Sequence, residues 1–331
     1  MKQGAESTPP LLRFWSPRYW PTWLLLLWFY AAAQLPFRAN VRLHKLLGRA
    51  GGALLGSSAR VARRNLELCF PERPAADIDA LLRRHFEAMG ACIGETAFAW
   101  FASLRRLRVP LDVEGQEHLD AALRRGRGVL LFTGHFTGLE MTGPLLNSLT
   151  DRFTFMFSGR RNPLLDVIQR RRRARIAKRW FPKDDVRGLL LSLRDNCVVW
   201  YAADQFYRGK RGELVDFFHE PAVTNTAVSR LASISGAAVL PFFYRRRADD
   251  SGYVLTFNPP PPDFPSGDPA ADTRRLILLL EAAIRRSPEQ YWWSHKRFRD
   301  RPAALPDAYA ASAAGVAPSP PQAGAPAVDA A

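Results

Sequence analysis

Val129-Leu130-Leu131-Phe132-Thr133 is followed directly by Gly134-His135-Phe136-Thr137-Gly138-Leu139-Glu140, and this stretch decides the fold. A run of about five apolar or β-branched residues that stops at a glycine is typical of a buried strand entering a turn. In α/β proteins, the loops that leave such strands carry much of the chemistry. The sequence therefore predicts a buried strand over 129–133 with His135 in the loop behind it.

His135 and Glu140 form the candidate reactive pair of this loop. Residues five apart on one continuous helix lie about 140° apart around its axis, so we expect His135 in the loop and Glu140 in the first turn of the next helix. From there the carboxylate could hydrogen-bond one imidazole nitrogen and raise the basicity of the other. The spacing predicts a general-base dyad, and the alternative is a surface pair or a hydrogen-bonded core histidine.

From Leu111 onward, short apolar segments alternate with amphipathic ones. Further strands are expected over 153–157, 198–202, 238–244 and 254–258, and helices over 140–148, 162–180, 187–193, 226–235 and 273–287. Short apolar strands separated by helices indicate a central, mostly parallel sheet with helices on its faces. The predicted fold class is therefore α/β.

The segments on either side of this region differ in composition. Residues 40–105 have helical periodicity, over 59–68 and 78–101, with a break at Pro71-Glu72-Arg73-Pro74. After Arg301 the chain becomes rich in Ala, Pro, Ser and Gly, which predicts a disordered tail. We expect a membrane anchor over 1–38, a catalytic domain over 39–303 and the tail over 304–331.

The anchor prediction comes from residues 20–37, which read WPTWLLLLWFYAAAQLPF and carry no formal charge. This length is about what a bilayer-spanning helix needs, and Trp and Tyr near its ends suit the membrane interface. A cleaved signal peptide and a helix lying in one leaflet are the alternatives. The basic residues that follow oppose export, and Pro21 and Pro36 leave spanning and in-plane anchoring open.

Charge and cysteine content narrow the functional class. The 331 residues carry a formal net charge of +16, with runs of arginine that suggest an acidic partner such as nucleic acid, anionic lipid or an acidic protein. Cys69, Cys92 and Cys197 are widely spaced and form no CxxC pair, which argues against a disulfide framework or a zinc site. A reducing cytoplasm is the expected compartment.

Several common catalytic motifs are missing, and one further acid stands out. The sequence has no GxSxG elbow, Walker loop, HExxH motif or GxGxxG after a strand. Asp204 follows the expected strand over 198–202, so it should share a sheet edge with His135. A turn or helix cap is the alternative role for this aspartate.

A series of short motifs follows along residues 17–302. They are the aromatic N-terminal segment, Arg64-Asn65-Leu66-Glu67-Leu68-Cys69-Phe70-Pro71-Glu72, the 135–140 box, Asn162-Pro163-Leu164-Leu165-Asp166, Asp204-Gln205, Val215-Asp216-Phe217-Phe218, and Gln290-Tyr291-Trp292-Trp293-Ser294-His295-Lys296-Arg297-Phe298. In these motifs the chain resembles the late acyltransferases of lipid A biosynthesis, the lauroyl and myristoyl type, within the lysophospholipid-acyltransferase-like superfamily. The resemblance implies acyl transfer from acyl carrier protein to a hydroxyl of a lipid A precursor, at the cytoplasmic face of the inner membrane.

The resemblance also implies roles for individual residues. His135 is the expected base on the acceptor hydroxyl, Glu140 its orienting acid, and Asp204 a further essential acid. Within the Arg170–Arg175 run, Arg173 aligns best with the family's active-site arginine. Asn162 has either a catalytic role or a helix N-cap role before Pro163.

The sequence also suggests residues that contact the substrates, and it leaves two alternative functions open. The basic residues Arg245, Lys296 and Arg297 are expected to dock the acidic carrier protein. The apolar residues Phe132, Phe136, Phe153 and Phe155 either line an acyl groove or belong to the core. Direct attack by the acceptor hydroxyl implies no metal or other cofactor. A glycerophospholipid acyltransferase is the enzymatic alternative, and a membrane-tethered nucleic-acid-binding protein is the alternative from another class.

Overall fold

The computed structural model describes residues 9–310 except 53–55, 178, 208 and 210–211. Its centre is a sheet of seven strands in the order β1-β9-β8-β2-β5-β3-β4. The strands are β1 (Leu111–Glu114), β2 (Val129–Thr133), β3 (Phe153–Phe157), β4 (Arg179–Pro182), β5 (Val198–Ala202), β8 (Ala238–Arg246) and β9 (Tyr253–Phe257). All neighbouring pairs are parallel except β8 and β9. The predicted α/β fold with a mostly parallel sheet is confirmed.

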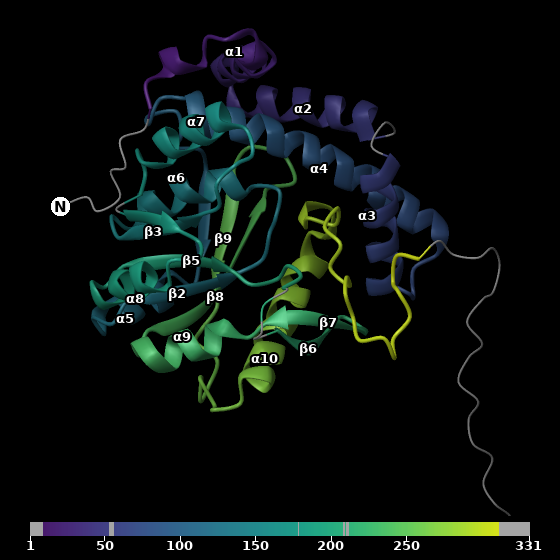
Figure 1. Ribbon diagram of the computed structural model, residues 1–331, viewed down its shortest axis with the longest axis vertical. Coiled ribbons are helices and arrows are strands. Elements are labelled where there is room, and N and C mark those ends of the chain that lie inside the picture. The colour runs from purple at the N-terminus through teal and green to yellow at the C-terminus, as the bar shows by residue number, and fades with distance from the viewer. Residues whose placement is uncertain (1–8, 53–55, 178, 208, 210–211, 311–331) are drawn as a thin grey trace, which may run out of the picture.

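Helices cover both faces of this sheet, as parallel strands require. Figure 1 shows α6 and α7 with α4 on one side, and α8, α9 and α10 on the other. Their bounds are α4 (Ala75–Phe101), α5 (Gln116–Arg124), α6 (Leu139–Leu149), α7 (Pro163–Arg173), α8 (Val186–Arg194), α9 (Ala227–Ser235) and α10 (Pro269–Arg286). A separate antiparallel hairpin of β6 (Gly212–Phe217) and β7 (Glu220–Asn225) packs against α10.

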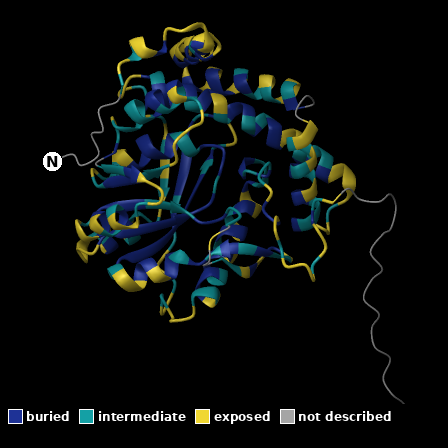
Figure 2. Cartoon of the chain, in the orientation of Figure 1, coloured by how far each residue is buried: buried dark blue, intermediate teal, exposed yellow. Residues whose placement is uncertain are grey.

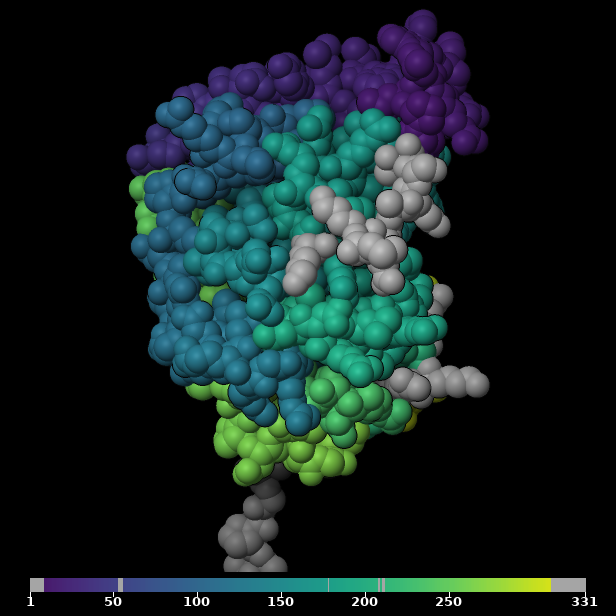
Figure 3. Space-filling model, turned by 90° about the vertical axis from the view of Figure 1, so that its left-hand side faces the viewer, coloured from purple at the N-terminus to yellow at the C-terminus, as the bar shows by residue number. Residues whose placement is uncertain are grey.

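An N-terminal layer of helices caps one end of the molecule (Figures 1 and 3). It consists of α1 (Trp20–Gln34), α2 (Phe37–Gly52) and α3 (Gly56–Cys69). Helices α2 and α4 pack so closely that a Cβ atom at Gly48 would lie 2.3 Å from the carbonyl oxygen of Phe86, so only glycine fits there. Among the described helices, none has both the length and the apolar character to cross a membrane.

The structure corrects the sequence prediction in two places. The apolar stretch over 20–37 is not one helix, because α1 ends at Gln34 and Leu35 has extended backbone before Pro36. The arginine-rich helix expected over 162–180 ends at Arg173, and residues 179–182 form strand β4 beside β3. Strand β1, helix α5 and the β6–β7 hairpin were not predicted. The part of the predicted tail from residue 311 lies outside the described residues.

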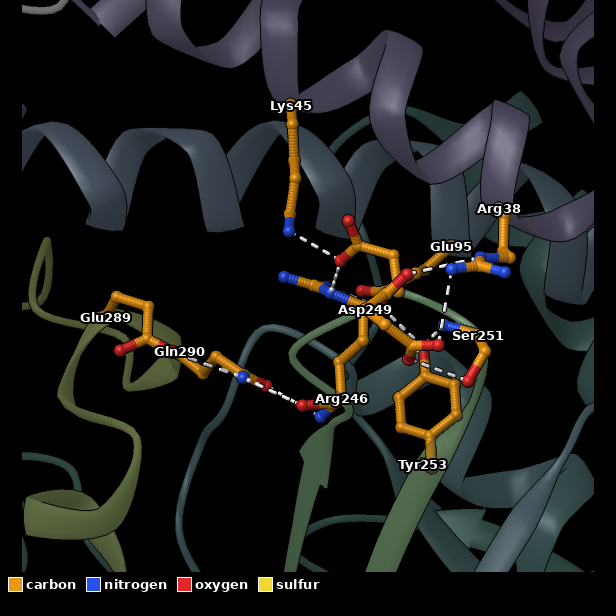
Figure 4. A network of polar contacts seen from close by, with 10 residues as sticks. Arg38, Lys45, Glu95, Arg246, Asp249, Ser251, Tyr253, Glu289 and Gln290 are labelled. Carbon is orange, nitrogen blue, oxygen red and sulfur yellow. Dashed lines mark hydrogen bonds and ion pairs between the residues drawn. The ribbon is translucent and has the colours of Figure 1, made fainter.

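A buried ion cluster ties the N-terminal layer to the sheet (Figure 4). Arg246 at the end of β8 donates to Glu95 of α4 at 2.7 Å and to Asp250 at 3.1 Å. Lys45 of α2 reaches the same Asp250 oxygen at 2.5 Å. Glu95 is fully buried and also accepts the Tyr253 hydroxyl at 2.5 Å. These contacts join helices α2 and α4 to β8 and β9.

Removing one member of this cluster should destabilise the protein strongly. We expect Arg246→Met to lower the free energy of unfolding by about 3–5 kcal/mol, because Glu95 would keep a buried charge without its partner. Urea denaturation measured by circular dichroism checks this. Arg247→Met is the matched control, since its partner Asp112 is largely exposed, and it should cost no more than about 1 kcal/mol. Equal costs for the two variants would contradict the role of the cluster.

Candidate active site

The pairing register of β2 and β5 brings His135 and Asp204 together. Thr133 and Ala202 are the last paired residues of these parallel strands. His135 and Asp204 each lie two residues beyond that pair, so both emerge at the same sheet edge. The expectation that they share an edge is confirmed, although 69 residues separate them in the chain.

Asp204 makes three hydrogen bonds that fix its carboxylate. Its Oδ1 atom lies 2.6 Å from His135 Nδ1, and its Oδ2 atom accepts the His135 backbone N–H at 2.8 Å. The Tyr291 hydroxyl donates to Oδ2 at 2.9 Å. Gly134 permits this approach, because a Cβ atom there would lie 2.6 Å from Leu280 Cδ1 and 3.3 Å from Asp204 Oδ2. The glycine before His135 therefore allows the Asp204 carboxylate to approach the His135 loop closely.

Electrostatics assign the protons of this pair. Burial by itself would raise the pKa of Asp204, but the charge and hydrogen bonds of His135 outweigh it and lower that pKa to about 2. Burial likewise favours a neutral His135 ring, yet the Asp204 charge raises the His135 pKa above its ordinary value. An ionised carboxylate can only accept, so His135 Nδ1 carries the proton and donates it. Nε2 is then the acceptor nitrogen of the neutral ring.

Glu140 does not orient His135 as the sequence predicted. It occupies the first turn of α6, as expected, but its carboxylate accepts from Arg173 Nη2 at 2.5 Å, Gln169 Nε2 at 3.0 Å and Trp100 Nε1 at 3.1 Å. Burial would raise the Glu140 pKa, and the Arg173 charge outweighs it and lowers that pKa. With both oxygens taken by donors from α4 and α7, Glu140 holds Arg173 in place, and Asp204 orients the histidine.

A cavity of about 660 Å³ opens beside these residues, within the range of small-molecule sites. His135, Glu140 and Arg173 line it together. Its other walls come from α6, β3, β5 and the segments that follow them, and they include Leu139, Thr142, Gly143, Phe153, Phe155, Phe157, Ile176, Lys183, Val186, Trp200, Tyr201, Gln205, Phe206 and Tyr207. Most of these side chains are apolar or aromatic.

Strand register shows how far the cavity runs along the sheet. Phe153 aligns with Val198, and Val198 aligns with Val129, the first residue of β2. Phe153 therefore lies four residues, roughly 13 Å at 3.3 Å per residue, from the edge that carries His135. Phe153 and Phe155 are both cavity wall and core, since each is less than a tenth exposed.

The other sequence-predicted binding residues lie outside this cavity. Asn162 is the N-cap of α7, where its Oδ1 atom accepts the backbone N–H groups of Leu164 and Leu165. Arg297 is 3% exposed and donates to Val223 and Thr224 of β7, so its expected role in docking a carrier protein is wrong. Arg245 is half-buried and borders a different, small cavity, whereas Lys296 is exposed.

Sequence reasoning missed three donors that complete the site. Trp100 and Gln169 bind Glu140, and Tyr291 binds Asp204. Only Tyr291 stood in a motif that the sequence singled out, and nothing in the local sequence pairs it with Asp204. Within the described residues, no group of three or more His, Cys, Asp or Glu side chains could hold a metal ion.

The proton assignment predicts a titration. In the wild-type protein, His135 should titrate above the ordinary histidine pKa of 6.5, and in Asp204→Asn below it, because only the burial effect remains. Nuclear magnetic resonance of ¹⁵N-labelled imidazoles measures both values. Buried His85, whose pKa is lowered to about 4 by desolvation, is the internal control and should not move. An unchanged His135 pKa in Asp204→Asn would contradict the pairing.

Comparison with known proteins identifies the family of this site. The family model described as bacterial lipid A biosynthesis acyltransferase matches residues 10–300. A lipid A biosynthesis lauroyltransferase of Escherichia coli (strain K12) is 35% identical over 88% of this chain and 96% of the relative. A lipid A biosynthesis palmitoleoyltransferase of the same strain is 34% identical over 87% and 94%, and a lipid A biosynthesis myristoyltransferase is 28% identical over 73% and 76%. With His135, Glu140, Arg173 and Asp204 all inside the matched residues, the chain belongs to the bacterial lipid A biosynthesis acyltransferases.

Proposed function

We propose that this enzyme moves a fatty acyl chain from the thioester of acyl carrier protein to a hydroxyl of a lipid A precursor in lipopolysaccharide biosynthesis. The observation that carries the proposal is the His135–Asp204 pair, whose histidine lines a cavity with many apolar and aromatic side chains. Family membership supports an acyltransferase of this pathway. The names of the relatives, each a lipid A acyltransferase, support the acceptor.

The chemistry assigned to His135 is general-base catalysis. Nε2 takes the proton of the acceptor hydroxyl as its oxygen attacks the thioester carbonyl, which forms the new C–O bond. Asp204 stabilises the imidazolium that results. When the tetrahedral intermediate collapses, the C–S bond breaks and the imidazolium returns the proton to the thiol that leaves. No covalent acyl-enzyme is needed.

Two positive groups line the cavity, and we assign to them the stabilisation of the negative charge that develops on the carbonyl oxygen. Helix α6 begins at Leu139 without a side-chain cap, and Leu139 and Glu140 line the cavity. The partial positive charge of this helix end stabilises an oxyanion. Arg173 lines the same cavity, and Glu140 fixes its orientation through the Nε and Nη2 atoms. Glu140 thus acts through Arg173.

We assign the acyl chain to the aromatic part of the cavity and the acidic carrier to the exposed cations beside it. The aromatic floor formed by Phe153 and Phe155 is suited to a hydrocarbon chain. Lys183 is an exposed cation in the cavity lining, next to exposed Asp184, and Arg187 is exposed in the first turn of α8. Acidic carrier proteins are attracted by such a rim. Lys183 and Arg187 replace Arg245 and Arg297 as the proposed docking cations.

We further propose that the enzyme sits on the cytoplasmic leaflet of the bacterial inner membrane through α1 and the segment before it. Figure 2 shows that the outer side of α1 is exposed. Large apolar side chains that are more than half exposed there are Leu12, Trp15, Trp20, Leu24, Leu27 and Tyr30. Exposed Arg13 and Arg18 lie in the same N-terminal segment. An apolar patch with aromatic and basic residues fits a lipid interface with anionic headgroups.

Activity separates the roles assigned to His135 and Glu140. His135→Ala should abolish acyl transfer, because no other base is assigned, whereas Glu140→Gln should retain a measurable rate of about 1% or less, since Arg173 loses its charged partner. The assay uses acyl carrier protein thioester and lipid A precursor, with acyl-coenzyme A as the comparison donor. Thermal melts control for folding. Wild-type turnover in His135→Ala, or equal use of both donors, would contradict the proposal.

Membrane attachment is tested by removing exposed apolar side chains from α1. The double variant Leu24→Ser/Leu27→Ser should lose most of its binding to vesicles that contain anionic phospholipid, because both side chains are more than 60% exposed and leave water on binding. Co-sedimentation with vesicles measures the bound fraction. Ile234→Ser, which removes a 70% exposed side chain from α9, is the control and should bind normally. Unchanged binding of the double variant would refute this attachment.

A further inference from the structure

The segment that follows α10 lies directly against the loop that carries His135. The backbone N–H of Thr137 donates to the Gln290 carbonyl at 2.8 Å, and the N–H of Trp292 donates to the His135 carbonyl at 3.0 Å. Phe136 and Tyr291 pair between these two bonds as an antiparallel β-bridge. Residues 290–292 therefore brace the active-site loop on both sides of Phe136.

Within this brace, the Tyr291 side chain is held rigidly. It is 4% exposed, and its ring packs against Phe136, Phe217 and Trp293 with centroid distances of 5.6, 6.0 and 4.9 Å. The hydroxyl meets Asp204 Oδ2 on the oxygen that also accepts the His135 backbone N–H. The carboxylate therefore cannot rotate without breaking two bonds, and Oδ1 stays directed at His135 Nδ1.

The brace is anchored from the opposite side by the buried ion cluster. Gln290 Oε1 accepts the Arg246 backbone N–H at 2.8 Å, and Gln290 Nε2 donates to the Arg246 carbonyl at 3.2 Å. Figure 4 shows Gln290 next to Arg246, whose guanidinium is held by Glu95. A continuous set of buried contacts thus runs from α4 through Arg246 and residues 290–292 to the His135 loop.

We propose that Tyr291 is a positioning residue for acyl transfer, whose hydroxyl fixes the Asp204 carboxylate so that its second oxygen orients His135. The proposal deepens the proposed function and rests on His135 as the general base. Tyr291 is not among the residues that line the cavity, so it acts on the rate and the proton affinity of the base rather than on donor binding.

His135 and Tyr291 share the negative charge of the Asp204 carboxylate, and this sharing sets the direction in which the His135 pKa changes when the Tyr291 hydroxyl is lost. The Tyr291 hydroxyl draws negative charge from the Asp204 carboxylate, and its loss would concentrate that charge on His135 and raise its proton affinity. His295, Arg297 and Tyr244 are the other titratable groups that face Asp204. Replacing Tyr291 with phenylalanine keeps the ring contacts with Phe136, Phe217 and Trp293, and the contact that it removes is the hydrogen bond to Asp204.

The test is Tyr291→Phe in the full-length enzyme, assayed with acyl carrier protein thioester across pH. We expect kcat to fall about tenfold, as for a lost hydrogen bond to a charged group, with KM for the donor within about twofold. The acidic limb of the kcat/KM profile should move to higher pH, since His135 must be neutral to act. Wild-type kcat with an unshifted limb would overturn the proposal, even if the melting temperature falls.

Two further variants distinguish positioning from folding. Ser229→Ala also removes a buried hydroxyl from a buried carboxylate, that of Asp272, and should lower the melting temperature while kcat and the pH profile stay near wild type. Site-specific 3-fluorotyrosine at 291 keeps the ring and has a stronger hydroxyl donor, so it should move the acidic limb to lower pH. A shift in the same direction as Tyr291→Phe, or none, would overturn the proposal. Activity of His135→Ala tests the base separately.

Discussion

A single buried carboxylate constrains the architecture around the active site. Asp204 is fully buried, and an ionised group there is tolerated only if hydrogen bonds replace its lost hydration. The donors come from the β2 loop and from the segment after α10, while Asp204 itself follows β5. Because each partner is supplied by a different part of the chain, the carboxylate can be satisfied only in the folded protein. The catalytic geometry and the folded structure therefore both depend on the hydrogen bonds to Asp204.

Two carboxylates in this site have different tasks because their partners differ. Asp204 faces a histidine and a tyrosine, so its charge tunes an imidazole. The Glu140 carboxylate accepts hydrogen bonds from Arg173, Trp100 and Gln169, so its charge holds the Arg173 guanidinium in place. The Trp100 ring also meets Phe29 of α1 edge to face, with centroids 6.0 Å apart. Two aromatic side chains therefore lie between helix α1, whose outer face we propose to meet the membrane, and the Glu140–Arg173 pair.

Local features of this fold could be predicted from the sequence, whereas contacts that depend on strand pairing could not. Strands over 129–133, 153–157 and 198–202 were predicted with their observed bounds, because a strand buried in a parallel sheet needs a continuous apolar run. The partner of His135 was assigned wrongly, because Glu140 is close in sequence whereas Asp204 is brought near only by the β2–β5 register. Strand β4 was missed because its arginine and tryptophan continue the pattern of α7, and only pairing with β3 distinguishes the two.

The burial of arginines explains why net charge was a poor guide to the docking surface. Arg173, Arg246 and Arg297 stand in sequence among other basic residues, yet each is mostly buried and bonded to acceptors at least 30 residues away. A guanidinium has five donors and a long apolar stem, so it can tie distant segments together inside a protein. These three arginines therefore stabilise the fold and are not available at the surface. Only charge that stays exposed can attract an acidic carrier, and for this reason we propose Lys183 of the cavity lining and exposed Arg187 as the docking cations.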